Sequence, residues 1–174
     1  MRVKVSIALA AGVLGMLLLS TPLEAATPTA AGLWAQADND GRVGGWFLLY
    51  ENNGVFEGAL AKMFPKPGED PNPICTKCSG DQKNQPSLGL VMIKGMQRNG
   101  LVYENGTILD PRSGAVYHAK MEVSPDGQQL TVRGYVGIPL FGKSVVWTRL
   151  PDDGLQPEET QPNLLPYLPV AKDN

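Results

Sequence analysis

The sequence predicts an all-β protein, built as an eight-stranded antiparallel up-and-down barrel. Two observations support this fold class. Turn signals recur regularly between residues 32 and 150, and the segments between them carry β-branched, aromatic and aliphatic residues, in places alternating with polar ones. No helical periodicity of useful length follows the N-terminal segment. The expected strands cover residues 32–37, 42–51, 55–64, 88–96, 101–109, 115–123, 128–136 and 143–150.

The turns between these strands are marked by short glycine-containing dipeptides. Asn-Gly and Asp-Gly are strong hairpin signals because both central residues must accept a positive φ. They occur at Asp40-Gly41, Asn53-Gly54, Asn99-Gly100 and Asp126-Gly127. Asn105-Gly106 follows the third of these too closely for another full strand, so a bulge or kink is expected there.

The clearest alternation lies in the segments 115–123 and 128–136. In the first, Ala115, Tyr117, Ala119, Met121 and Val123 share one face, and in the second Leu130, Val132 and Gly134 repeat the pattern. An eight-stranded barrel has an interior that is either filled by side chains or wide enough for one small ligand, and both alternatives stay open. The residues expected to line a ligand site are Trp46, Tyr117, Met121, Leu130 and Val132.

The N-terminal segment has the layout of a secretory signal peptide. Arg2 and Lys4 precede an uncharged run over residues 5–19, and small residues end the segment at Ala25. The run is short for a membrane span, so cleavage after Ala25 is expected, leaving no spanning segment. The mature protein is expected to be periplasmic or secreted, with one barrel domain over residues 26–150.

The C-terminal segment, residues 151–174, is acidic and rich in proline. Proline blocks helix interiors and central strands, so an extended, mobile tail is expected. Its apolar cluster, Leu164, Leu165, Tyr167 and Leu168, could alternatively dock on the barrel or on a protein partner. The net charge is −2 and is unevenly placed, with the acidic residues concentrated in this tail, and neither the tail nor the barrel region has the basic surface expected of a nucleic-acid-binding protein.

The two cysteines, Cys75 and Cys78, lie in a proline-rich loop over residues 65–87. A disulfide is the default in an exported chain with an even cysteine count. Zinc is disfavoured because only His118 could add a nitrogen ligand, and haem attachment is excluded because Ser79 follows Cys78. A reactive redox pair stays open, and no cofactor is expected.

Several motifs carry a resemblance to known families. The triplet "GLW", Gly32 to Trp34, resembles the Gly-x-Trp signature of lipocalins, in which a basic residue from near the end of the barrel packs on the tryptophan; Arg149 is placed to do so. Together with "DGRV", "CTKCSGD", "LGLVMIKGM", "GTILDPRSGAVYHAKMEV" and "LTVRGYVGIPLFGKSVVWTR", it resembles the bacterial family catalogued as domain of unknown function 2147. The resemblance covers residues 32–150 and implies a small exported protein with a lipocalin-like, calycin-like barrel and no established activity.

Three functions fit these observations. The leading hypothesis is a non-enzymatic binding protein that holds a small apolar or amphipathic ligand in the barrel. The alternatives are a protein-binding module, such as a periplasmic protease or lysozyme inhibitor, and a thiol-disulfide oxidoreductase acting through Cys75 and Cys78. Other enzymes have no support, because no serine or cysteine has an identifiable base and His118 falls on the polar face of its strand.

Overall fold

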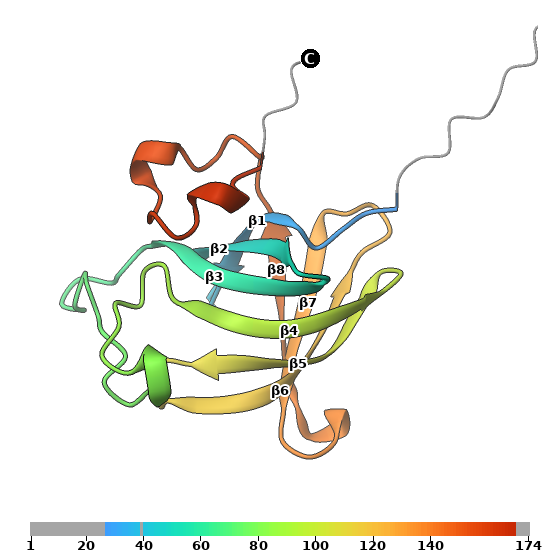
Figure 1. Cartoon of the computed structure of the whole chain (residues 1–174), viewed down its shortest axis with the longest axis horizontal. Coiled ribbons are helices and arrows are strands. Elements are labelled where there is room, and N and C mark those ends of the chain that lie inside the picture. The colour runs from blue at the N-terminus through green and yellow to red at the C-terminus, as the bar shows by residue number, and fades with distance from the viewer. Residues whose placement is uncertain (1–26, 39, 170–174) are drawn as a thin grey trace, which may run out of the picture.

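The computed structural model describes residues 27–38 and 40–169, and its strands close into one antiparallel barrel (Figure 1). The strands are β1 (Gly32–Ala37), β2 (Val43–Asn52), β3 (Val55–Met63), β4 (Val91–Asn99), β5 (Val102–Asp110), β6 (Ala115–Val123), β7 (Gln129–Tyr135) and β8 (Lys143–Arg149). Each strand pairs with its neighbour in the chain, and Trp34 opposite Arg149 joins β1 to β8. The fold class predicted from the sequence is confirmed.

Four short 3₁₀ turns complete the described part of the chain: η1 (Gly80–Gln82), η2 (Pro139–Phe141), η3 (Pro157–Glu159) and η4 (Leu165–Tyr167). None of its helical segments has the length and apolar character needed to cross a membrane. The signal peptide expected at residues 1–25 lies outside the described residues.

The strand boundaries follow the turn chemistry. Asn53 and Gly54 both have positive φ, 51° and 82°, as the β2–β3 hairpin turn requires. Near Asn105, which also has a positive φ, the β5–β6 register shifts, so the expected irregularity is present. The largest boundary difference is at β4, which begins at residue 91 rather than 88. Gly89 has a φ of 83° and the Leu90 N–H donates to the Ser87 carbonyl, so the chain turns there before the strand begins.

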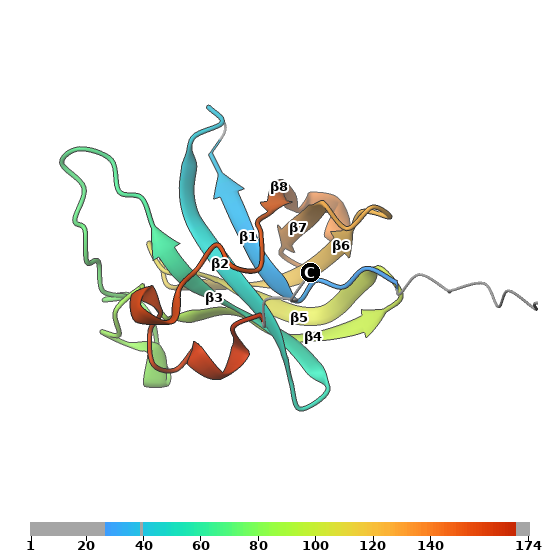
Figure 2. The same cartoon turned by 90° about the horizontal axis from the view of Figure 1, so that it is seen from above.

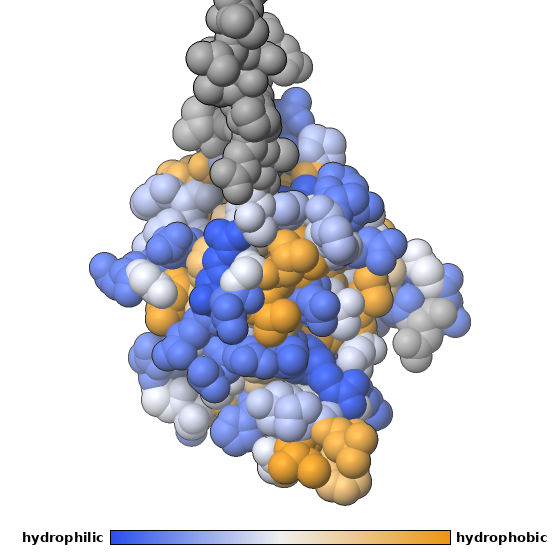
Figure 3. Space-filling model, turned by 90° about the vertical axis from the view of Figure 1, so that its right-hand side faces the viewer, coloured by the Kyte–Doolittle hydropathy of each residue, from blue (hydrophilic) through white to orange (hydrophobic). Residues whose placement is uncertain are grey.

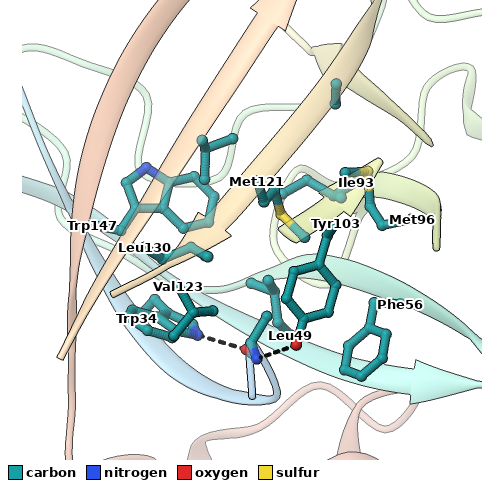
Figure 4. Close-up of a cluster of buried hydrophobic side chains, with 13 residues drawn as sticks. Trp34, Leu49, Phe56, Ile93, Met96, Tyr103, Met121, Val123, Leu130 and Trp147 are labelled. Carbon is teal, nitrogen blue, oxygen red and sulfur yellow. Dashed lines mark hydrogen bonds between the residues drawn. The ribbon is translucent and has the colours of Figure 1, made fainter. Parts of the chain in front are cut away.

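The barrel has two different ends. The segment 27–31 and the β2–β3, β4–β5 and β6–β7 hairpins lie at one end, which we call the closed end. The loops that follow β1, β3, β5 and β7 lie at the other, which we call the open end. The interior from the closed end to mid-barrel is filled by a buried cluster (Figure 4) that includes Trp34, Leu49, Phe56, Ile93, Met96, Tyr103, Met121, Val123, Leu130, Val132 and Trp147.

The C-terminal tail differs from the expectation. Residues 151–169 lie against the outer face of β2 and β3 (Figures 1 and 2), where Leu155 and Leu164 are buried among Leu33, Leu48 and Ala59. Tyr167 stacks on Tyr50 with ring centroids 3.9 Å apart, and Glu159 pairs with Lys62 at 2.9 Å. These residues are therefore packed on the barrel rather than extended, which is the docking that the sequence left open for the apolar cluster. Prolines exclude long helices and central strands, but they also start 3₁₀ turns, as Pro157 and Pro166 do here.

Tyr50 shows how the tail changes the outer face of the barrel. Burial raises the pKa of its hydroxyl well above the ordinary value, and the nearby negative charge of Glu57 raises it further. The neutral phenol is therefore the form that the folded protein holds beneath the tail.

Candidate functional site: a cup at the open end

The closed end is sealed by the three residues that carried the lipocalin resemblance. The Arg149 guanidinium lies 4.2 Å from the Trp34 ring centroid and donates to the carbonyls of Thr29, Ala31 and Gly127. Gly32 makes this approach possible, because a Cβ there would lie 2.5 Å from Arg149 Nη1. The glycine, the tryptophan and the arginine thus form one packed unit that closes the barrel.

Ala30 completes the seal. Its carbonyl accepts a hydrogen bond of 2.8 Å from Trp34 Nε1, and its N–H donates to the Tyr103 hydroxyl at 2.8 Å (Figure 4). Both polar groups of these buried aromatic side chains are therefore satisfied, so neither side chain offers a free polar group to a ligand.

The open end contains a cup of about 420 Å³. Phe47 and Trp147 form its floor, Leu60, Met92 and Ile108 stand in its wall, and Gln36, Arg112 and Tyr117 lie among its polar lining residues. The floor is rigid, because Phe47 and Trp147 stack with centroids 4.4 Å apart and their planes at 24°. A concave, mainly apolar surface with a few polar groups is typical of small-molecule sites.

One polar atom at the floor of the cup stands out. The Trp147 indole is 2% exposed, and its Nε1–H has no hydrogen-bond partner among the described residues. Figure 4 shows this nitrogen on the edge of the ring that faces away from Trp34. A buried donor without an acceptor costs about 1–3 kcal/mol. Almost none of the surface of this nitrogen is exposed, so an acceptor brought by a ligand would recover the cost only if the side chains at the floor of the cup move.

The rim of the cup carries charge in the turn between β5 and β6. Arg112 Nε pairs with an Asp110 carboxylate oxygen at 3.1 Å. Partial burial pushes the pKa of Asp110 up, but hydrogen bonds from Arg112 and Ser113 together outweigh it and hold this pKa below its ordinary value. Asp110 is therefore a charged, internally satisfied turn residue rather than a base for catalysis.

The five residues expected to line a ligand site fall in three places. Tyr117 lines the cup. Met121, Leu130 and Val132 lie in the filled part of the interior. Trp46 is not inside the barrel, because it packs on the outer face with Lys62, whose Nζ lies 5.0 Å from the ring, and with Phe64.

The misplacement of Trp46 has a simple cause. In β2, Phe47 and Leu49 point inward, while Leu48 and Tyr50 point outward and are covered by the tail. Both faces of this strand are apolar, so alternation cannot tell them apart. Sequence reasoning also missed Trp147 and Val145. The sequence did contain a signal for them: side chains alternate between the two faces of a strand, so Trp147 and Val145 lie on the same face of β8 as Arg149.

Cys75 and Cys78 form a disulfide with their Cα atoms 5.4 Å apart. Both side chains are buried against Leu60, Leu90, Met92 and Leu109, on the outer side of the cup wall. The intervening Lys77 carbonyl packs so closely on Gly114 that any Cβ there would collide with it. The disulfide therefore fixes the long β3–β4 loop against the β5–β6 turn at the rim.

Reducing this disulfide is expected to lower the free energy of unfolding by about 2 kcal/mol, because closing so short a loop restricts the unfolded chain only modestly. Urea denaturation with and without a phosphine reductant measures the change. The C75A/C78A variant is the control and is expected not to respond to the reductant. An unchanged midpoint for the reduced wild-type protein would contradict a structural role for the disulfide.

Other chemistry finds little support in the described part of the chain. His118 is exposed and lies beside Tyr135, with ring centroids 5.6 Å apart. No three histidine, cysteine, aspartate or glutamate side chains gather there closely enough to hold a metal ion. Two other hollows in the described part of the chain are larger, but the cup has the more apolar lining and is therefore the candidate site for a small molecule.

The comparisons with known proteins agree on family and fold. The family described as "Uncharacterized protein conserved in bacteria (DUF2147)" matches residues 32–149. A solved structure described as "Protein HP1028 from the human pathogen Helicobacter pylori belongs to the lipocalin family" superposes with a TM-score of 0.61 at 18% identity, covering 76% of this chain and 87% of that one. No curated protein matches the chain. The protein belongs to the DUF2147 family of bacterial proteins, and its fold is a lipocalin-like barrel.

Proposed function

We propose that this protein is an exported, non-enzymatic binding protein that holds one small amphipathic molecule in the cup at its open end. The observation that carries the proposal is the mainly apolar cup of about 420 Å³, whose lining includes Trp147, a residue with a buried N–H that has no partner among the described residues. The site is built to accept an oxygen from a ligand whose remaining surface is apolar.

The chemistry of the cup narrows the ligand class. Phe47, Leu60 and Met92 offer apolar surface, while the floor offers one neutral donor. A carboxylate held only by that donor would lose most of its hydration without an opposite charge. Arg112 stands at the rim and is already paired with Asp110. The ligand is therefore a neutral molecule with a carbonyl or ether oxygen, such as a ketone or an ester.

Titration calorimetry with 2-octanone tests the proposal. Val145 lines the cup and Val146 lies next to it in sequence on the outer face of β8, so V145W should block binding and V146W should not. W147F keeps the stacked ring but removes the donor, so it should weaken binding about fivefold, the equivalent of one ordinary hydrogen bond. Equal heats for wild type and V145W would show that the cup is not the site.

The alternative functions have weaker support. A protease or lysozyme inhibitor remains a prediction without a matching site. For a thiol-disulfide oxidoreductase the burial of both cysteines is unfavourable, because exchange requires access to a sulfur atom. The disulfide is compatible with the periplasmic or secreted location that we propose.

A further inference from the structure

The most apolar exposed surface of the described protein is the loop between β7 and β8, residues 136–142, which we call the tip. Val136, Ile138, Leu140 and Phe141 are all more than half exposed, with Leu140 at 76% and Phe141 at 78%. Figure 3 shows an apolar knob at the end of the molecule, where η2 projects in Figure 1. Exposed apolar clusters of this kind mark interaction sites.

The tip is held in shape by its own backbone and by one arginine. The Phe141 and Gly142 N–H groups donate to the carbonyls of Ile138 and Pro139 at 3.2 and 3.0 Å. Arg133 donates from Nε to the Pro139 carbonyl at 2.6 Å and from Nη2 to the Leu140 carbonyl at 3.3 Å. Its Nη1 also reaches Ser144 Oγ at 2.8 Å, which ties the guanidinium to the start of β8.

The hydrogen bonds to the backbone of the tip affect how easily the tip can enter a hydrocarbon phase. A backbone N–H or C=O group that moves from water into hydrocarbon without a hydrogen-bond partner costs several kcal/mol of free energy. In the tip, the carbonyls of Ile138, Pro139 and Leu140 have partners inside the protein, and Pro139 has no N–H to satisfy. These three carbonyls therefore do not need water as partners when the apolar side chains of the tip enter a lipid surface.

The charges near the tip favour one kind of partner. Arg133 and Lys143 flank the tip, and the sequence has no acidic residue between Gly127 and Leu150. Lys143 stands exposed directly after the tip, and Tyr135 stands directly before it. Apolar side chains backed by basic residues and a tyrosine are the arrangement that binds the interface of an anionic membrane. The tip is also convex, whereas a protein partner that received it would need a matching groove.

We propose that the tip docks this protein on the surface of a lipid bilayer, with Leu140 and Phe141 inserted among the lipids and Arg133 and Lys143 at the level of anionic headgroups. The docking does not depend on what the cup binds. It places the open end of the barrel toward the membrane, because the tip follows β7 at that end.

Flotation of the full mature chain with vesicles tests this proposal. Binding is expected with phosphatidylcholine vesicles that contain phosphatidylglycerol, and it should weaken without the anionic lipid or in high salt. L140S/F141S should lower the partition coefficient at least about tenfold, because two apolar side chains no longer enter the bilayer. L165S removes an exposed leucine from the tail and should bind like wild type. W147F should also bind like wild type, which separates this proposal from the cup.

A second measurement reports insertion itself. Phe141→Trp places a tryptophan at the tip, and lipids brominated on their acyl chains should quench its added fluorescence. Unquenched fluorescence, or equal flotation of wild type and L140S/F141S, would overturn the proposal. Tip-dependent self-association in sedimentation, without vesicle binding, would overturn it in favour of a second copy as the partner.

Discussion

Replacing Leu164 with alanine is expected to lower the free energy of unfolding by about 3 kcal/mol. Leu164 is fully buried in the tail, where it packs with Leu33 and Leu48 on the outer face of the barrel. Removing its side chain leaves a cavity between the tail and the outer face of the barrel. Urea denaturation followed by circular dichroism measures the loss.

Leu165 provides a matched control in the next position of the chain. It is 42% exposed, so L165A should cost much less, within about 1 kcal/mol. If L164A and L165A were equally mild, the tail would not be part of the folded domain. The tail would then be the extended segment that its prolines first indicated.

The Arg149→Met variant is expected to lose about 3 kcal/mol of stability as well. Methionine can cover the Trp34 ring, but it leaves the carbonyls of Thr29, Ala31 and Gly127 without the guanidinium donor, at a cost of about 1 kcal/mol or more each. Arg149 is partly buried, which lowers the pKa of its guanidinium, and hydrogen bonds made in such a partly desolvated place are costly to lose.

Arg149→Lys tests whether the shape of the guanidinium is what matters. Lysine keeps the charge, but its compact ammonium lacks the planar fork that spans three carbonyls, so a loss between wild type and R149M is expected. Thermal unfolding of the three proteins ranks them. An R149K variant as stable as wild type would indicate that charge alone, rather than the fork over Trp34, holds the closed end together.

The barrel could be predicted from the sequence because short glycine-containing dipeptides mark several of its hairpin turns. Asn53-Gly54 and the alternation over residues 115–123 fix hairpins with local chemistry alone, and the first and sixth strands match their expected bounds. The unit of Gly32, Trp34 and Arg149 was predictable only through resemblance, because Gly32 and Arg149 are far apart in the chain.

The cup could not be predicted in the same way. Alternation tells which side chains point inward, but it does not tell how deep each one lies along the barrel axis. Met121 and Tyr117 share one face of β6, yet the first lies in the filled interior and the second lines the cup. Trp46 was misplaced because the tail hides an apolar outer face, which is a contact between distant segments.

Ligand binding in the cup can be observed in a ¹⁵N–¹H spectrum of the labelled protein titrated with 2-octanone. The three tryptophans give three indole signals, and W147F identifies the one from the floor of the cup. We expect the Trp147 signal to shift in a saturable way, while the Trp34 signal stays in place because the Trp34 N–H is bonded to the Ala30 carbonyl. A Trp147 signal that does not move while 2-octanone binds would contradict the account.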